Sequence, residues 1–299
     1  MTDIPFKRNL TLAPDTVDEP MPGLRRIMAD NPGPFTFRGT ITYVIGGGKV
    51  AILDPGPDAA AHVAAVLDAV RNETVTHIIV THTHLDHSPA VKAVKAATGA
   101  KTYAEGPHRP SRELHEGDML RSADRDFRPD VALKDGDVVE GDGWRLEAVT
   151  TPGHTTNHLA FSLHGTDVLF SGDHVMGWST SIVAPPDGSM ADYVASLHKL
   201  RQRRETLYFP GHGPASDNAP DFVDHFIAHR KQREQSILQK LRDGPCDVSA
   251  IVGSAYAGLD ARLVAAARMT VLAHLEDLVA RGLAKADGGL PTIDRIFHL

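Results

Sequence analysis

The sequence predicts an α/β protein in which strands and helices alternate along most of the chain. Short apolar runs rich in Val, Ile and Leu end at glycine, as in KVAILDPG, DVLFSGD and TLYFPGHG, and these runs are typical of strands that finish in turns. Alanine-rich segments with helical spacing of apolar residues lie between several of them. Because such alternation layers helices on sheets, we expect a layered α/β fold.

The N-terminal half contains most of the elements that can be placed from local pattern. The first 35 residues are rich in Pro, Asp and Gly, and we expect an irregular lead-in. GTITYVIG and KVAILDPG predict a hairpin around Gly46, Gly47 and Gly48. Further along we expect a helix over 58–72, a buried strand over 76–82, a helix over 88–98 and a strand over 101–106.

A polar segment then precedes the C-terminal half. Residues 107–130 predict an irregular surface segment, in which we interpret His108 and His115 as surface residues. The strands expected after it cover 145–153, 158–164, 167–173 and 206–213, with a helix over about 188–202.

The C-terminal end of the chain differs in pattern from the rest. A long helix over about 220–242 ends at Gly244-Pro245. Helices over 247–256 and 260–281 follow, then a β-like end, which together resemble a winged-helix module. We therefore predict a catalytic domain over 1–240 and a small winged-helix-like domain over 241–299.

Composition excludes several classes of protein. The 299 residues are 41% hydrophobic and 23% charged, an ordinary globular balance, and the net charge of -7 disfavours DNA as a partner. The single cysteine excludes a disulfide framework. No signal peptide or membrane-spanning run is evident, so we expect a cytoplasmic protein with no membrane partner.

A cluster of metal-ligand residue types stands at the end of the strand predicted over 76–82. In THTHLDH, His82 and His84 alternate and are expected to point the same way, while Asp86 and His87 face a second position. His154 in TPGHT, Asp173 in SGD and His212 in PGHG each follow another predicted strand. A single histidine at a strand end is usually structural, but seven such residues together indicate a site for two metals.

These motifs, in this order, resemble the metallo-β-lactamase superfamily over about residues 35–235. The resemblance implies a four-layer αβ/βα sandwich with the metals at one edge, between two sheets. It assigns His82, His84 and His154 to one metal and Asp86, His87 and His212 to the other, with Asp173 bridging them. Asp54, in ILDPG, matches a structural acid that supports the ligand loop.

Such a site predicts a binuclear metal-dependent hydrolase. Two divalent ions, expected to be zinc with iron or manganese as alternatives, would bind a bridging hydroxide that attacks the substrate. We expect Asp86 to act as a catalytic residue that orients this hydroxide. His158, His174 and Tyr193 are candidates for contacts behind the ligands or with substrate, and structural roles for them stay open.

The sequence indicates the substrate less clearly than it indicates the nucleophile. Zinc β-lactamases carry a cysteine where this chain has Asp173, so antibiotic cleavage is not expected. Residues 171–299 are similar to the beta-lactamase-like protein 2 group, whose eukaryotic members cleave single-stranded RNA and whose fungal relatives release acyl groups from carrier proteins. The resemblance therefore implies either an ester or thioester hydrolase or an endoribonuclease.

Charge favours the first alternative. The predicted C-terminal domain is slightly acidic, whereas a domain that grips nucleic acid should be basic. Residues 243–299 hold five Lys/Arg against seven Asp/Glu: Arg262, Arg268, Arg281, Lys285 and Arg295 against Asp243, Asp247, Asp260, Glu276, Asp277, Asp287 and Asp294. We expect a small-molecule or carrier-bound acyl substrate, keep RNA as the alternative, and disfavour a non-catalytic binding module because all seven ligand residues are present. The sequence does not indicate an oligomeric state.

Two groups of basic residues remain. Arg201, Arg203 and Arg204 form one group, and Arg230, Lys231 and Arg233 form the other. We interpret both as solvated helix faces, with a docking patch for RNA or an acidic carrier domain as the alternative.

Overall fold

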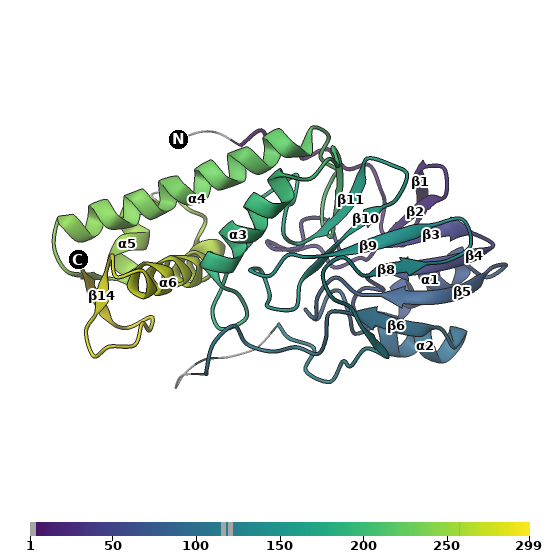
Figure 1. Cartoon of the computed structure of the whole chain (residues 1–299), viewed down its shortest axis with the longest axis horizontal. Helices are drawn as coiled ribbons and strands as arrows, with labels where there is room; N and C mark the ends of the chain where they lie inside the picture. The colour runs from purple at the N-terminus through teal and green to yellow at the C-terminus, as the bar shows by residue number, and fades with distance from the viewer. Residues whose placement is uncertain (1–3, 115–117, 119–121, 257) are drawn as a thin grey trace.

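Two β-sheets pack face to face, and helices cover their outer faces (Figure 1). The computed structural model describes residues 4–114, 118, 122–256 and 258–299. The first sheet has the order β1-β2-β3-β4-β5-β6-β7. Its strands are β1 (Val17–Met21), β2 (Leu24–Met28), β3 (Ile41–Gly47), β4 (Lys49–Leu53), β5 (Thr74–Ile79), β6 (Lys101–Ala104) and β7 (Val131–Ala132).

The second sheet has the order β12-β11-β10-β9-β8. Its strands are β8 (Val138–Glu140), β9 (Arg145–Thr150), β10 (Leu159–Leu163), β11 (Val168–Gly172) and β12 (Leu207–Pro210). Helices α1 (Ala60–Ala69) and α2 (Val91–Thr98) cover the first sheet, and α3 (Met190–Arg201) and α4 (Ala219–Arg242) cover the second.

Alternation of side chains along the strands builds the layers. On β4, Ala51 and Leu53 belong to the core between the two sheets, whereas Val50 and Ile52 pack with Val66 of α1 on the outer face. Neighbouring residues of a strand point to opposite faces, so a strand covered on both sides needs apolar residues throughout. The expected four-layer sandwich is confirmed.

Parallel strands bring their carboxyl ends to one edge of the sandwich. β4, β5 and β6 are parallel neighbours in the first sheet, and β11 and β12 are parallel in the second. Ligands of open α/β sheets bind where strands of this kind end. The histidine and aspartate motifs follow these ends.

The prediction of an irregular lead-in was wrong, because β1 and β2 form the edge of the first sheet. Neither strand shows a clear apolar alternation in the sequence, because β1 is mostly exposed and reads VDEPM, and β2 reads LRRIM with two arginines at its centre. Arg26 binds Asp18 of β1, and Arg25 binds Glu73 at 2.6 Å. Arg25 and Arg26 therefore lie in strand β2, where the charged residues of the sequence suggest a loop. The short strands β7 and β8 were also missed.

The C-terminal elements have a core of their own around Val271, Leu275 and Phe297. They comprise β13 (Cys246–Asp247), α5 (Val248–Ala255), the 3-10 turn η1 (Ala261–Leu263), α6 (Val264–Ala280), β14 (Lys285–Ala286) and β15 (Ile296–His298). α4 runs from the sandwich into this core, so it crosses the boundary that we propose at 240/241. Among the described residues, no helix is long and apolar enough to span a membrane.

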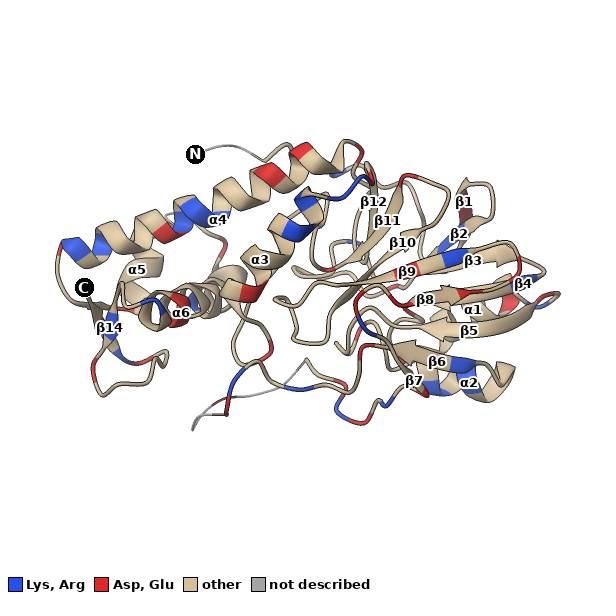
Figure 2. Ribbon diagram, viewed as in Figure 1, with Lys and Arg blue, Asp and Glu red and all other residues tan. Residues whose placement is uncertain are grey.

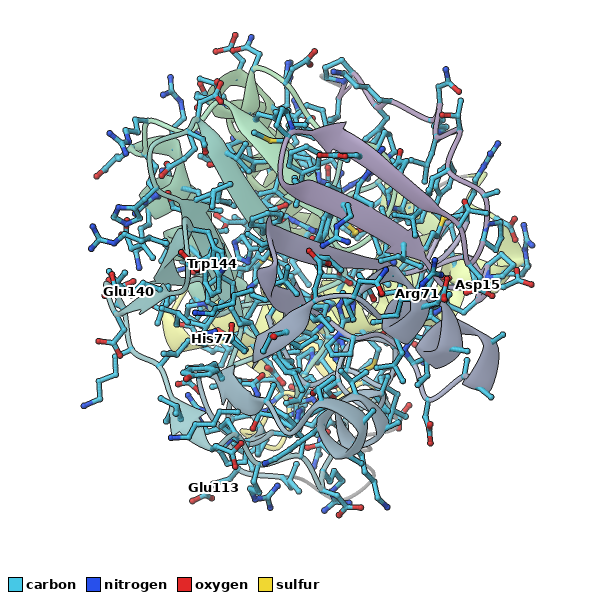
Figure 3. All side chains as sticks on the ribbon, turned by 90° about the vertical axis from the view of Figure 1, so that its right-hand side faces the viewer. Asp15, Arg71, His77, Glu113, Glu140 and Trp144 are labelled. Atoms are coloured by element: carbon cyan, nitrogen blue, oxygen red, sulfur yellow. The ribbon has the colours of Figure 1, made fainter. Side chains whose placement is uncertain are left out.

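Trp144 closes the sandwich at the end where β9 begins (Figure 3). Its indole Nε1 donates to the Lys49 carbonyl oxygen at 3.2 Å, and its ring meets His77 edge to face with centroids 5.1 Å apart. Gly46 lies so near that a Cβ there would come within 2.5 Å of the indole. This one side chain joins β3, β4 and β5 to the second sheet.

Replacing Trp144 by alanine should lower the free energy of unfolding by about 3–5 kcal/mol, because a buried indole would leave a cavity between the sheets. Urea denaturation followed by circular dichroism measures this loss. Phe35, which is 44% exposed, provides the control, and its change to alanine should cost less than about 0.5 kcal/mol. A loss below about 1 kcal/mol for Trp144→Ala would contradict its role as the closing residue.

Candidate metal centre

Loops at the carboxyl ends of four strands carry the candidate ligands. One loop joins β5 to α2, and the others follow β9, β11 and β12. Their seven side chains are His82, His84, Asp86 and His87 in the first loop, then His154, Asp173 and His212. His84 and Asp86 are half-buried, and the other five are buried. The first motif lies in a turn, because β5 ends at Ile79 and α2 begins only at Val91.

Three imidazoles converge on one point. His82 Nε2 lies 3.2 Å from His84 Nδ1, and His154 Nε2 lies 3.0 Å from the same atom. Zinc–nitrogen bonds of 2.0–2.1 Å in a tetrahedron place two ligand nitrogens roughly 3.3 Å apart. The trio therefore has a spacing suited to one ion, and the expected common direction of His82 and His84 is confirmed.

A second group lies beside the trio. His212 Nε2 is 3.1 Å from Asp86 Oδ2, and His87 Nε2 is 3.5 Å from the same oxygen. Asp173 stands between the two groups, since its Oδ2 is 3.3 Å from His212 Nε2 and 3.7 Å from His154 Nε2. One carboxylate thus reaches both groups.

The other nitrogen of each buried ligand imidazole is held by the protein. His82 Nδ1 meets Thr81 Oγ1 at 2.9 Å, His154 Nδ1 meets the Ile182 carbonyl oxygen at 2.7 Å, and His212 Nδ1 meets the Gly39 carbonyl oxygen at 3.3 Å. Contacts of this kind fix the ring orientation and leave Nε2 to face the site.

Asp54 organises the ligand loop from behind. Its two carboxylate oxygens accept from the Thr81 backbone N–H and hydroxyl, each at 2.7 Å, and from His87 Nδ1 at 2.9 Å. The side chain is 2% exposed and belongs to the turn after β4. Asp54 therefore lies one layer behind His87, in the position that the sequence suggested for it.

Two glycines allow the backbone to approach the site. A Cβ on Gly211 would stand 2.5 Å from Asp173 Oδ1 and 2.7 Å from His87 Cε1. Gly172 has a φ of +49°, and a Cβ there would lie 2.5 Å from His158 Nε2. The glycines of SGD and PGHG thus leave space that the site itself fills.

Burial and charge divide the imidazoles into two kinds. Burial and the neighbouring imidazole of His84 lower the pKa of His154 to about 4, and burial also lowers the pKa of His82. Burial alone would lower the pKa of His212 too, but Asp173 and Asp86 raise it to about 9. Neutral imidazole is the form that binds metals, so the lowered pKa values of His82 and His154 favour metal binding.

Unsatisfied atoms test whether these residues suit a metal. His87 Nε2 and Asp173 Oδ1 are buried and have no hydrogen-bond partner among the described residues. Buried polar atoms almost always have partners, and those without one call for a missing ion or water. The donors are imidazole nitrogens and carboxylate oxygens within 4.8 Å of one another, and they suit divalent cations.

The three further candidates lie behind the ligands. His158 Nε2 accepts from the Asp173 backbone N–H at 3.2 Å, so its proton is on Nδ1, which meets Thr151 Oγ1 at 2.8 Å. Tyr193 is fully buried and donates to the His174 carbonyl oxygen at 2.9 Å. The rings of His174 and Tyr193 pack with centroids 4.4 Å apart, which is the environment of core residues.

The structure also brings in residues that the sequence did not single out. Asp187 faces His84 Nε2 at 3.4 Å and His108 Nε2 at 3.1 Å, and Thr40 Oγ1 donates to Asp86 at 3.1 Å. The interpretation of His108 as a surface residue was wrong, since its side chain is 2% exposed. His115 lies outside the described residues.

The segment 178–182 joins the metal edge to a cavity of about 520 Å³. Ile182 lines the cavity and also accepts the hydrogen bond from His154, while Trp178 stacks on Phe37 with centroids 5.0 Å apart. Residues of α4 and α6 form the far wall. The segment after Asp173 therefore lines a cavity.

Comparisons with known proteins agree with this geometry. The sequence profile of the metallo-beta-lactamase superfamily matches residues 35–212, and that of the beta-lactamase associated winged helix domain matches residues 248–292. A metallo-beta-lactamase family protein from Thermus thermophilus superposes with a TM-score of 0.75 at 23% identity, over 93% of this chain and 99% of that one.

Curated relatives extend the match. A beta-lactamase-like protein 2 homolog from Caenorhabditis elegans is 32% identical over 73% of this chain and 70% of its own length. An atrochrysone carboxyl ACP thioesterase from Paecilomyces divaricatus is 32% identical over 75% of this chain, which spans 66% of that relative. The fold, the order of the motifs and these matches agree: the chain is a hydrolase that belongs to the metallo-beta-lactamase superfamily.

Proposed function

We propose that the chain is a binuclear metal-dependent hydrolase of thioesters or related esters. His82, His84 and His154 would hold one divalent ion, Asp86, His87 and His212 would hold the other, and Asp173 would contact both. The observation that carries this proposal is the position of the Asp173 carboxylate, 3.3 Å from His212 Nε2 and 3.7 Å from His154 Nε2. We propose zinc as the metal, with iron and manganese as alternatives for the same ligands.

Two divalent ions at these positions would activate a water at neutral pH and polarise the acyl carbonyl. Hydrolysis adds the water oxygen to the acyl carbon and breaks the carbon–sulfur bond. It leaves a carboxylate and a thiol, with one proton of the water on the sulfur and the other released to solvent. Asp86 is the residue that we assign to orienting the water. Its carboxylate is held by the Thr40 hydroxyl at 3.1 Å and faces His212.

Two observations support an acyl substrate. Relatives named atrochrysone carboxyl ACP thioesterase include proteins from Paecilomyces divaricatus and Aspergillus fumigatus, at 32% and 30% identity. Asp173 stands at the position where the resemblance places a cysteine in zinc β-lactamases, which argues against antibiotic cleavage. A small-molecule thioester and a carrier-bound one share the bond that we propose is cleaved.

Charge argues against the alternative, cleavage of single-stranded RNA. Both acidic and basic residues occur along α4 and through the C-terminal domain (Figure 2). Two of the basic residues noted in the sequence are paired with acids, because Arg203 contacts Glu147 and Glu205, and Arg201 contacts Asp224. The interpretation of Arg230 as part of a solvated helix face was wrong, since this residue is buried. Cleavage of a short labelled RNA that disappears in His82→Ala would favour the nuclease over the thioesterase.

Replacing Asp86 by alanine should reduce thioester hydrolysis by roughly 10²–10⁴-fold, because the group that we assign to aligning the water is removed. A thiol-detecting dye measures turnover, and metal analysis of the same sample measures occupancy. Asp142→Ala, at a side chain 70% exposed, should match the wild type. Near-normal turnover with full metal content in Asp86→Ala would refute the assigned role.

Gly211→Ala should weaken zinc binding by roughly tenfold or more without removing a ligand, because the added methyl would displace Asp173 or His87. Gly47→Ala is the matched control, since a Cβ there meets nothing within 4 Å. Competition with a chromophoric chelator compares the two variants. Equal zinc affinity in both would show that the space beside Gly211 is not part of the site.

A further inference from the structure

The cavity beside the metal edge has an unusual charge pattern. Among the described residues that line it, arginines occur but aspartate and glutamate do not, although the whole chain carries a net charge of -7. Arg230 is 3% exposed and its Nε has no hydrogen-bond partner within the described part of the chain. The remaining wall is largely apolar, with Phe37 and Trp178 on the metal side. Such a cavity suits a ligand that is partly apolar and carries an anion.

Arg233 is the arginine best placed to meet that anion. Its Nε lies 3.3 Å from His229 Nε2, its Nη1 donates to the Ala255 carbonyl oxygen, and its guanidinium carbon lies 4.2 Å from the centroid of the Tyr256 ring. The side chain is thus fixed from two sides. Within the described residues, no acidic side chain pairs with it and no hydrogen bond engages its Nη2.

Arg233 stands where this cavity continues into a second one of about 1020 Å³. The two share Phe6, Ser179, Thr180, His229 and Arg233 along their walls. The second cavity follows α4 outwards past Lys240 and Arg242 to Asp243, and Figure 2 shows both basic and acidic bands along this helix. At about 1.5 Å per residue, the lining from His229 to Arg242 extends roughly 20 Å.

We propose that these joined cavities bind the thiol-side arm of the substrate and that Arg233 binds a phosphate on that arm. The inference rests on the proposed thioester hydrolase function, because it assigns the leaving group of that reaction. The arm would pass from the metal edge, along segment 178–182, to the guanidinium. Groups beyond the phosphate would lie in the second cavity, near Lys240 and Arg242.

Phosphopantetheine, the thiol arm of coenzyme A and of acyl carrier proteins, is a long arm that ends in a phosphate. Its thiol and phosphate are separated by roughly thirteen bonds, or about 15 Å when extended at about 1.2 Å per bond. A guanidinium offers a planar pair of donors that fits two phosphate oxygens. Shorter thiols end before the second cavity, so they would not use its basic outer part.

A matched pair of substrates tests the assignment. S-hexanoyl phosphopantetheine and S-hexanoyl pantetheine differ only in the phosphate, so the ratio of their kcat/KM values isolates that group within each variant. The wild type should prefer the phosphorylated ester roughly tenfold or more. Arg233→Gln should bring the ratio close to one, and Arg233→Lys should keep part of the preference because it retains the charge.

Lys231→Gln is the control, because it removes one positive charge from α4 outside both cavities. Its ratio should equal that of the wild type. A wild-type ratio near one, or a ratio unchanged in Arg233→Gln, overturns the inference while leaving the hydrolase proposal intact. Loss of folding in Arg233→Gln is excluded by the rate on the unphosphorylated ester, which should stay near the wild-type value.

Binding separates this inference from the reaction itself. The thioether S-hexyl phosphopantetheine cannot be hydrolysed, and calorimetry should show tighter binding to the wild type than to Arg233→Gln. If neither ester is hydrolysed, the proposed function is refuted. In that case calorimetry still tests the phosphate site: tighter binding to the wild type than to Arg233→Gln supports it, and equal binding refutes it. Hexanoyl-CoA and a hexanoyl carrier protein, compared at equal concentration, identify the source of the arm. A short RNA that displaces the thioether and is cleaved would overturn the assignment.

Discussion

Five imidazoles and two carboxylates share one buried space, and the rest of the structure depends on how their mutual repulsion and attraction are balanced. Their donor atoms approach one another to between 3.0 and 3.7 Å. Buried polar atoms at that spacing need partners, yet His87 Nε2 and Asp173 Oδ1 have none among the described residues. This donor set suits divalent cations, and the pair of cations that we propose would satisfy both the unpartnered atoms and the negative charge.

The surrounding elements are arranged to hold this cluster. Asp54 ties the end of β4 to Thr81 and His87, and Gly172 and Gly211 leave the space that the ligands occupy. The segment after β11 contributes the Ile182 carbonyl oxygen to His154 and Asp187 to His84. Arg230 of α4 donates to the Ser181 carbonyl oxygen next to it. The helix that continues into the C-terminal domain is therefore linked to the ligands through one short segment.

Local sequence signals predicted much of the fold and singled out the seven candidate ligands. Glycine ends or follows β9, β11 and β12 just before a candidate ligand, and β5 is an apolar run that leads directly into THTHLDH, so these strands and the positions after them can be recognised locally. Strands β1 and β2 were missed because their arginines are neutralised by Asp18 and Glu73, and Glu73 lies far away in sequence. The contact of His108 with Asp187 joins residues 79 positions apart, which periodicity cannot reveal.

The candidate metal ligands and the residues that line the cavity belong to different parts of the fold, so the proposed nucleophile and the substrate preference would depend on different residues. The candidate ligands come from rigid strand ends, whereas the cavity is lined by the segment 178–182 and by α4 and α6. The most direct test of the central claim is metal analysis of the wild type and of His212→Ala after saturation with zinc and gel filtration. The account predicts two ions per chain in the wild type and one in the variant, held by the trio of His82, His84 and His154. About one ion per chain or fewer in the wild type would contradict it.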